Sequence, residues 1–366
     1  MGSSQGEART PADENAETQG FPKVFGKYVL VRPMARGGMG ELFLAAAGET
    51  GGFEKMCVVK KVLRSVEDQG VHRRFLDEAK VVVRLNHANL VQVFDAGRVD
   101  EEYYLAMELV EGKDLRAVWN RCAQLHRRIP VEVAIFVIRE ILRGLEYAHD
   151  ALGLDLVHRD ISPPNLLLGY RGEVKLTDFG LAKSAIKREM TSPGVVFGRY
   201  SYLAPEQAKG LPADRRTDIY ACGIVLWELL TGRQLFPSAG RSHQQALAAV
   251  RNPKVRAPSS LVPGIPDGLD AVVLRSLAKE PKDRHQAAGE LRTELSNVLS
   301  RHFPGCDADR AGEFMRDIFA REYKLEGRDV AELSQRDFTG LRADAQHTSS
   351  ISLSEALAAE DGSSAM

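Results

Sequence analysis

One stretch, DLVHRDISPPNLLLGYRGEVKLTDFG at residues 155–180, constrains the fold of this chain more than any other. Two short apolar runs, Leu166–Leu168 and Val174–Leu176, are separated by a Gly-Tyr-Arg-Gly turn, which predicts a β-hairpin. Because a hairpin returns the chain to where it started, we expect Asn165 and Asp178 to lie side by side at its open end.

The polar side chains at and near the open end of this hairpin indicate the type of reaction that the chain could catalyse. Two neighbouring oxygen donors, from Asn165 and Asp178, suit Mg²⁺, which is usually shared with substrate phosphates. Asp160, on the loop that enters the hairpin, is a third group that need not bind the metal, and it can orient a hydroxyl and accept its proton. The stretch therefore predicts phosphoryl transfer.

The motif H-R-D-x-x-x-x-N, from His158 to Asn165, followed by D-F-G from Asp178, resembles the catalytic core of eukaryotic-like bacterial serine/threonine protein kinases. The resemblance implies an α+β, two-lobed protein kinase fold, with a small lobe of antiparallel β-sheet plus one helix and a large, mainly helical lobe. It also implies ATP and Mg²⁺ as cofactors and serine or threonine residues of proteins as acceptors.

Composition limits the partners. The 366 residues include 49 Lys and Arg against 50 Asp and Glu, so no net charge favours binding to nucleic acid or membrane. Four scattered cysteines indicate a reducing compartment, no signal peptide is evident, and the longest apolar segment is too short to cross a bilayer. We expect a soluble cytoplasmic protein.

The domain organisation follows from these patterns and from the extent of the resemblance. We expect five segments: a disordered segment at 1–25, a small lobe at 26–110, a large lobe at 111–303, a helical C-terminal extension at 304–345 and a disordered tail at 346–366.

The extension contains an amphipathic pattern from Asp307 to Tyr323, with Phe314, Ile318 and Phe319 on one face. This pattern predicts a helix that packs on the large lobe. The alternative is a docking or dimerisation helix, through which the chain would associate with itself.

A glycine-rich turn at Ala35, Gly37 and Gly40 separates two strand-like runs. Glycines there let backbone amides approach a triphosphate. The turn is similar to the kinase G-x-G-x-x-G loop, except that Ala35 replaces the first glycine. We expect Ala35 to stiffen the loop without abolishing nucleotide binding.

Lys60 lies in a predicted strand and aligns with the lysine of the kinase V-A-I-K motif. Glu78 lies on the inward stripe of a predicted helix at 71–85, where a carboxylate needs a partner. The resemblance pairs Lys60 with Glu78 at the α- and β-phosphates. The alternative for a strand lysine is a solvated charge, which is what we expect of the next residue, Lys61.

The resemblance assigns the remaining nucleotide contacts. Leu42, Val58 and Leu167 would enclose the adenine, and Val58 replaces the usual alanine. The others are Met107 as gatekeeper, Glu108 to Val110 as the hinge, and Asp114 at the ribose.

Two residues depart from the family pattern. Ser162 replaces the lysine that normally follows the catalytic aspartate, and Arg199 replaces a threonine near the Ala-Pro-Glu segment. One hypothesis is that Arg199 supplies the missing cation. The alternative is that Arg199 points to solvent or to an acidic substrate side chain.

The segment from Asp178 to Glu206 matches the kinase activation segment. Arg159 and Lys183 would form a basic cluster, which a phosphate on Thr191 or Ser192 would satisfy. The alternative is an unmodified loop of small polar residues.

Three more residues have an architectural role in the family. Asp218, at the start of an apolar helix, matches the aspartate that holds the catalytic-loop backbone. Glu206, of the Ala-Pro-Glu segment, would pair with Arg284.

Two other functions remain open at the level of the sequence. Ala35, Ser162 and Arg199 are compatible with a catalytically weak pseudokinase that acts as a scaffold. A small-molecule phosphotransferase is the second alternative, although such enzymes usually lack the partners Glu206 and Arg284.

Overall fold

The structure is a computed structural model that describes residues 20–37, 40–48, 54–62, 79–100, 102–150, 156–179, 199–237, 240–343 and 350–352. The described residues form two compact units. Unit 1 takes its residues from 1–83, 93–109 and 327–366, and unit 2 from 84–92 and 110–326.

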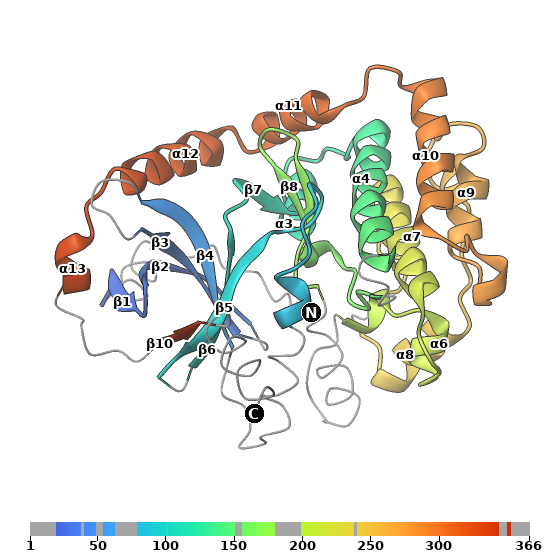
Figure 1. Ribbon diagram of the computed structural model, residues 1–366. Coiled ribbons are helices and arrows are strands. Elements are labelled where there is room, and N and C mark those ends of the chain that lie inside the picture. The colour runs from blue at the N-terminus through green and yellow to red at the C-terminus, as the bar shows by residue number, and fades with distance from the viewer. Residues whose placement is uncertain are drawn as a thin grey trace. The chain divides into compact units, whose positions relative to one another are not determined.

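Unit 1 is built on a seven-stranded antiparallel sheet with the order β1-β2-β3-β4-β6-β5-β10. Its strands are β1 (Lys23–Phe25), β2 (Tyr28–Gly37), β3 (Gly40–Ala47), β4 (Lys55–Val62), β5 (Val93–Val99), β6 (Glu102–Glu108) and β10 (Ser350–Ser352). Figure 1 shows the long strands β2, β3 and β4 side by side. The alternation of side chains gives this sheet two distinct faces.

One face of the sheet carries the larger apolar cluster of unit 1. Phe43 and Ala45 of β3 pack there with Cys57 and Val59 of β4, and Tyr104 of β6 closes the cluster. Burial raises the pKa of the Cys57 thiol to about 12, so this cysteine is an inert core residue.

Unit 2 is mainly helical and also holds a three-stranded sheet, β7 (Gly112–Asp114), β8 (Leu166–Gly169) and β9 (Val174–Leu176). Its α-helices are α3 (Leu115–Gln124), α4 (Val131–Asp150), α6 (Pro205–Ala208), α7 (Arg215–Thr231), α8 (His243–Arg251), α9 (Leu269–Ser276), α10 (Ala288–His302), α11 (Ala308–Ile318) and the first part of α12 (Ala320–Ser334). Short 3-10 turns are η2 (Pro163–Asn165), η3 (Arg199–Tyr202), η4 (Pro258–Ser260) and η5 (Pro281–Asp283).

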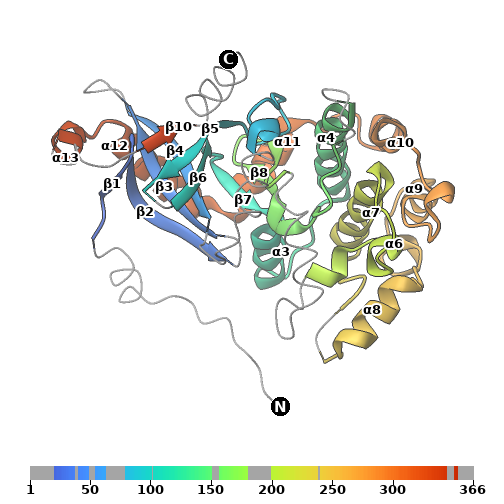
Figure 2. The same ribbon diagram turned by 60° about the horizontal axis from the view of Figure 1, so that its bottom comes forward.

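Helices α4, α7 and α10 form the centre of unit 2, where α4 packs against both α7 and α10 (Figure 2). Every residue of α7 from Thr217 to Thr231 is buried, as its apolar sequence predicts. The helix ends at Gly232, whose φ of 65° is the left-handed conformation that favours glycine.

The C-terminal extension contains three helices, α11, α12 and α13 (Thr339–Ala343). The predicted single helix over 307–323 is interrupted at Phe319, which follows α11 and precedes α12. Phe314, Ile318 and Phe319 are buried, and α11 contacts α3, α4 and β8. The prediction that this helix packs on the larger unit is confirmed for α11, and self-association through the C-terminal extension stays a prediction.

The predicted fold class is confirmed, but the expected segment boundaries need correction. The expectation of disorder is wrong for Lys23–Phe25, which form β1, and for Ser350–Ser352, which form β10 and pair with β5. Unit 1 also includes residues from 327 onward, which we assigned to the extension. Backbone pairing at a sheet edge needs no apolar side chains, so composition alone could not reveal β10.

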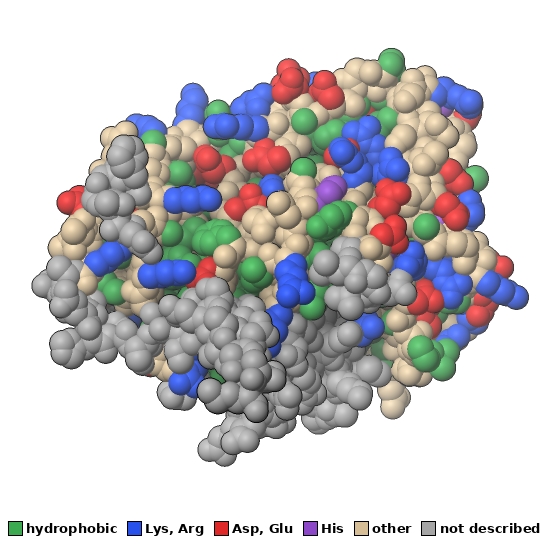
Figure 3. Space-filling view, in the orientation of Figure 1, with side chains coloured by type: hydrophobic (Ala, Val, Ile, Leu, Met, Phe, Trp, Pro, Cys, Tyr) green, Lys and Arg blue, Asp and Glu red, His purple; other side chains and the backbone are tan. Residues whose placement is uncertain are grey.

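The surface shows no separation of charge on the face in Figure 3, where acidic and basic side chains are interspersed. This agrees with the near balance of the two signs in the sequence. Among the described residues, no helix combines the length and the apolar character needed to cross a lipid bilayer.

Candidate functional site

The predicted hairpin is present in unit 2 and positions the catalytic loop. Leu166 of β8 opposes Leu176 of β9, and the next residue, Thr177, donates its backbone N–H to the carbonyl oxygen of Asn165 at 3.0 Å. Asp178 follows directly. The backbone bond therefore brings Asn165 and Asp178 to the same end of the hairpin.

Asn165 is oriented by Asp160. The Asn165 Nδ2 donates to the backbone oxygen of Asp160 at 2.8 Å and to its carboxylate Oδ2 at 3.1 Å. Because the nitrogen end of the planar amide is bonded to Asp160, the opposite end, Oδ1, is left as an oxygen ligand. An amide oxygen and the Asp178 carboxylate fit Mg²⁺, which is commonly held by one or two carboxylates together with phosphates.

The described residues contain no group of three or more His, Cys, Asp and Glu side chains placed to hold a metal ion by themselves. A magnesium ion that is shared with a nucleotide does not require such a group.

Two residues of the loop have left-handed backbone conformations, Arg159 with φ 69° and Asp178 with φ 61°. Such conformations cost non-glycine residues about 1–2 kcal/mol, and they persist only where the surroundings fix them. Asp100 and His126 have the same backbone conformation elsewhere in the chain, so it is the contacts around the loop that distinguish it.

Asp218 at the start of α7 supplies much of that constraint. Its Oδ2 accepts the backbone N–H of His158 at 2.8 Å, and its Oδ1 accepts that of Arg159 at 2.7 Å. The Nε2 of the buried His149 lies 2.9 Å from Asp218 Oδ2. The carboxylate is fully buried at 0% exposure, so these contacts replace water around it. The contact between His149 and Asp218 was not predicted from the sequence.

His158 joins the two halves of the site. Its Nε2 lies 3.0 Å from the carbonyl oxygen of Thr177, and its ring contacts Phe179 edge to face at 4.8 Å between centroids. His158 thus connects the catalytic loop to the Asp-Phe-Gly segment through its contacts with Thr177 and Phe179.

Glu206 and Arg284 form a buried two-point ion pair. Arg284 Nη1 donates to Glu206 Oε1 at 2.8 Å, Nη2 donates to Oε2 at 2.7 Å, and the Thr217 hydroxyl adds a third bond at 2.9 Å. Burial opposes ionisation of Glu206, but the Arg284 guanidinium outweighs it and holds the pKa of the carboxyl below its usual value. The pair fixes the start of α6 to the turn at Arg284.

A second buried carboxylate, Glu228 on α7, was missed by the sequence analysis. Its Oε2 accepts the hydroxyl of Tyr202 at 2.8 Å, and its Oε1 accepts the backbone N–H of Leu235 at 3.0 Å. Tyr202 belongs to η3, two residues before the Ala-Pro-Glu segment. A glutamate within an apolar helix was the available signal, because such a group needs partners.

In unit 1, the strand register places several predicted nucleotide residues on one face of the sheet, opposite to the face that carries the cluster of Phe43, Cys57 and Tyr104. Leu42 of β3 opposes Lys60 of β4, and Val58 of β4 opposes Met107 of β6. Opposed residues in antiparallel strands share a face. Ala35 of β2 opposes Leu42. Lys60 is buried, so the alternative of a solvated strand lysine does not apply to it.

Gly40 has a steric reason to be glycine. A Cβ atom at this position would lie 2.2 Å from the carbonyl oxygen of Lys61 on the neighbouring strand. At Gly37, by contrast, a Cβ would meet no atom within 4 Å, so only the second of these glycines is required by the close approach of β4.

Of the remaining adenine and ribose candidates, Val110, Asp114 and Leu167 belong to unit 2. Asp114 opposes Leu167 across β7 and β8, and it caps α3 by accepting the backbone N–H of Ala117 at 2.8 Å. Asp114 thus has a structural task that the sequence analysis did not foresee. Val110 precedes β7, and Glu108 ends β6 in unit 1.

Several candidates lie outside the described residues. These are Glu78, Lys183, Thr191 and Ser192. Arg199 begins η3, but its side chain is not among those described, and Ser162 is a buried residue that precedes η2. The expected Lys60–Glu78 pair, the compensation of Ser162 by Arg199 and the phosphorylation sites therefore stay predictions.

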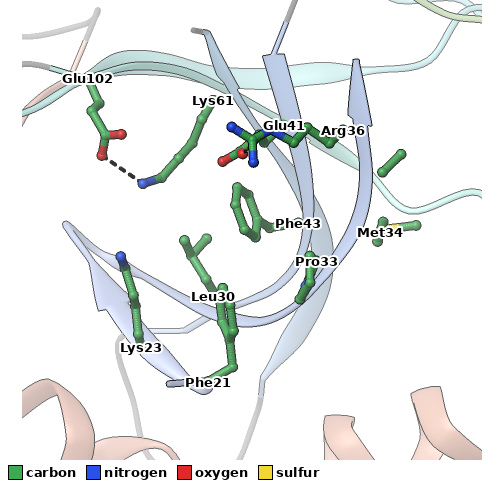
Figure 4. Close-up of a pocket in the computed structure, with 11 residues that line it drawn as sticks. Phe21, Lys23, Leu30, Pro33, Met34, Arg36, Glu41, Phe43, Lys61 and Glu102 are labelled. Atoms are coloured by element: carbon green, nitrogen blue, oxygen red, sulfur yellow. Dashed lines mark hydrogen bonds and ion pairs between the residues drawn. The ribbon is translucent and has the colours of Figure 1, made fainter. Parts of the chain in front are cut away.

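Unit 1 also has a cavity of about 370 Å³ (Figure 4), lined by Phe43 and Lys61 on the face opposite to Leu42 and Lys60, and also by Ala35 of the predicted phosphate loop. Phe43 lines its centre, and Lys61 reaches across it to Glu102 at 2.7 Å. The expectation that Lys61 is solvated is wrong, because it is only 7% exposed and its Nζ lies 4.2 Å from the centroid of the Phe25 ring. Strand alternation turns Lys61 to the face of the sheet where the rings of Phe25 and Phe43 lie.

Comparisons with known proteins agree with this geometry. The family described as "Protein kinase domain" matches residues 28–295. Tyrosine-protein kinase MasK of Myxococcus xanthus is 37% identical over 304 residues, which cover 81% of this chain and 47% of that protein. Serine/threonine-protein kinase PrkC of Bacillus subtilis is 34% identical over 295 residues, covering 80% of this chain and 42% of that one.

A solved structure is also similar. The PknI kinase domain of Mycobacterium tuberculosis has a TM-score of 0.60 at 26% identity, covering 76% of this chain and 98% of that one. This likeness confirms the expected two-lobed fold. The chain spans less than half the length of the two curated relatives named above.

Proposed function

The chain belongs to the protein kinase family, and on that premise we propose that it transfers the γ-phosphoryl group of ATP to serine and threonine hydroxyls of protein substrates. The observation that supports this most directly is the catalytic loop of unit 2, where Asn165 is bonded to Asp160 and tied through Thr177 to the start of the Asp-Phe-Gly segment.

In this proposal Asp160 orients the acceptor hydroxyl and accepts its proton. The buried Asp218 keeps Asp160 in position because it holds the two preceding backbone N–H groups. Asn165 and Asp178 would hold Mg²⁺. A metal ion held there would supply positive charge to offset that of the phosphates.

In unit 1, Lys60 and Glu78 would position the α- and β-phosphates, and the loop at Ala35, Gly37 and Gly40 would cover them. The adenine would be enclosed by Leu42, Val58 and Leu167 and would bond to the hinge from Glu108 to Val110. The shared face of Leu42, Val58, Lys60 and Met107 supports this assignment.

Three further parts of the proposal concern regulation and placement. Arg199 would supply the cation that Ser162 lacks. Phosphorylation of Thr191 or Ser192 by the enzyme itself would draw Arg159 and Lys183 together. We place the reaction in the cytoplasm, as the cysteine usage indicates.

A pseudokinase is not supported, because Asp160, Asn165 and Asp178 are all retained. A small-molecule phosphotransferase is disfavoured by the buried Glu206–Arg284 pair, which anchors the segment where kinases bind protein substrates. The relative named as a tyrosine kinase favours tyrosine as a second acceptor, so the test must identify the residue that is labelled.

Incubation of the full chain with radiolabelled ATP, Mg²⁺ and a generic protein substrate tests the proposal. We expect wild type to label serine and threonine, and Asp160→Asn to lower the rate at least about a hundredfold, as expected on removal of a positioned general base. Asp309→Asn is the matched control, because it makes the same change at an exposed position of α11.

Two results would contradict the proposal. Equal labelling by wild type and Asp160→Asn would remove Asp160 from the reaction. Label found on tyrosine alone after acid hydrolysis would replace serine and threonine as the acceptors.

A further inference from the structure

The C-terminal segment, Gly327–Ala343, belongs to unit 1, although it lies beyond the residues matched by the protein kinase family. Phe338 is only 1% exposed. Its apolar cluster consists of Val29, Leu44, Ala46 and Met56 of the sheet, with Val330 and Leu333 of α12 packed against it. The segment therefore contributes to the core of a unit that is otherwise formed more than 200 residues earlier in the chain.

A buried ion pair anchors the same segment. Arg342 donates from Nη1 and Nη2 to the two carboxylate oxygens of Glu54 at 2.6 and 2.7 Å, and the Glu54 side chain is fully buried. Two-point bonds of this kind fix orientation as well as position. Glu54 immediately precedes β4, so the segment is fixed to the start of the strand that carries Val58 and Lys60.

The sheet face under Phe338 is also the face that carries the predicted nucleotide residues. Strand register shows this through three opposed pairs of β3 and β4, which are Leu42 with Lys60, Leu44 with Val58, and Ala46 with Met56. Opposed residues and every second residue along a strand share a face. The Phe338 cluster therefore continues directly into the predicted adenine pocket.

The cluster also reaches the predicted hinge. Leu109 is partly buried against it, and Leu109 follows Glu108 at the end of β6. On the same strand, Met107 opposes Val58. The apolar cluster around Phe338 therefore adjoins two parts of the predicted adenine site, the sheet face and the hinge.

We propose that the C-terminal segment positions the nucleotide-binding face of unit 1, and that Phe338 is a positioning residue acting through Leu44 and Leu109. This inference rests on the proposed function, which assigns that face to ATP. Removing the Phe338 ring leaves a cavity into which its neighbours relax, because packed cores collapse only partly around a deletion. The adenine contacts shift, whereas Asp160 and Asn165 of unit 2 keep their bonds.

The test measures binding of ATP with Mg²⁺ to the full chain by calorimetry, together with the KM for ATP and kcat. We expect Phe338→Ala to weaken binding about fivefold or more, the lower end of typical coupling between sites, and to raise KM while kcat stays within about twofold of wild type. Phe338→Leu should restore most of the affinity. Leu341→Ala, at a 38% exposed position of α13, is the matched control and should leave affinity unchanged.

If Phe338→Ala does not fold, two milder variants, Phe338→Leu and Val330→Ala, provide the test. Affinity should then fall in the order wild type, Phe338→Leu, Val330→Ala, since Val330 packs on the same cluster. Folded Phe338 variants that bind ATP like wild type would overturn the inference and leave the proposed function intact. A wild-type chain that fails to bind ATP would instead overturn the proposed function.

Discussion

At the scale of single residues, the molecule contains two buried glutamates whose pKa values are shifted in opposite directions. Glu206 is paired with Arg284, and its pKa is lowered despite burial. Among the described residues, Glu228 bonds to two neutral groups, the Tyr202 hydroxyl and the backbone N–H of Leu235, and burial raises its pKa to about 7. A buried carboxylate without a cationic partner takes up a proton more readily than one that is paired.

Glu228 should make the stability of the chain depend on pH. Its folded-state pKa is about 7 and its ordinary value is 4.5, so between these values the unfolded chain has lost a proton that the folded chain retains. The free energy of unfolding therefore falls as pH rises from 4.5 to 7 and levels off above 7. We expect urea unfolding of Glu228→Gln to show a shallower fall than wild type, by up to about 3 kcal/mol over this range.

Arg116 is the charged group near Glu228, and it acts to lower the pKa of the carboxyl. Arg116→Gln should therefore move the wild-type transition to higher pH. Parallel stability curves for wild type and Glu228→Gln would show that this carboxyl does not titrate in the folded protein over this range.

At the scale of elements, α12 (Ala320–Ser334) is divided between the two units. Its first part belongs to unit 2, where Arg121 pairs with Glu322 and where Lys113 and Tyr170 bond to Glu326. Its second part begins at Gly327 and belongs to unit 1. A glycine at the point of division weakens the helix there, because glycine loses the most backbone freedom on folding.

Gly327→Ala should stabilise α12. A Cβ atom at Gly327 would meet no atom within 4 Å, so alanine fits without strain. We expect a gain of about 0.5–1 kcal/mol in the free energy of unfolding, measured by thermal or urea denaturation.

Gly312→Ala in α11 is the informative comparison. A Cβ at that position would lie 2.8 Å from the backbone carbonyl carbon of Arg171, so this substitution should destabilise the chain. If Gly327→Ala lowered stability as well, the position would need the conformational freedom of glycine.

At the scale of the whole molecule, the chain has two units with separate cores. Unit 1 draws on three separate stretches of sequence, and its apolar clusters contain residues of the sheet and of the C-terminal segment. Unit 2 is larger and contains the fully buried α7. A smaller unit buries a smaller fraction of its surface and is correspondingly less stable.

The two units should unfold at different denaturant concentrations. Both tryptophans of the chain, Trp119 and Trp227, belong to unit 2, so their fluorescence follows that unit alone. Hydrogen exchange at backbone amides of β4 and β6 follows unit 1. We expect unit 1 to open at the lower urea concentration, and coincident transitions by both probes would show that the chain unfolds as one cooperative unit.

Much of this organisation was predictable from local patterns. The β8–β9 hairpin and α7 were predicted because turn residues and runs of apolar side chains are local properties of the sequence. The placement of Asn165 next to Asp178 followed from the hairpin alone. The Glu206–Arg284 pair came from the family resemblance, since no local pattern connects residues so far apart in the chain.

The sequence by itself determined the fold class and the catalytic loop, because both depend on motifs whose spacing is short and whose backbone geometry is local. Tertiary structure alone decided that Lys61 is buried, that His149 orients Asp218 and that Glu228 bonds to Tyr202. It also decided that Phe338 packs on a sheet whose strands begin near the other end of the chain. Such contacts depend on which distant faces meet, and a long-range pairing leaves no periodic trace in the sequence.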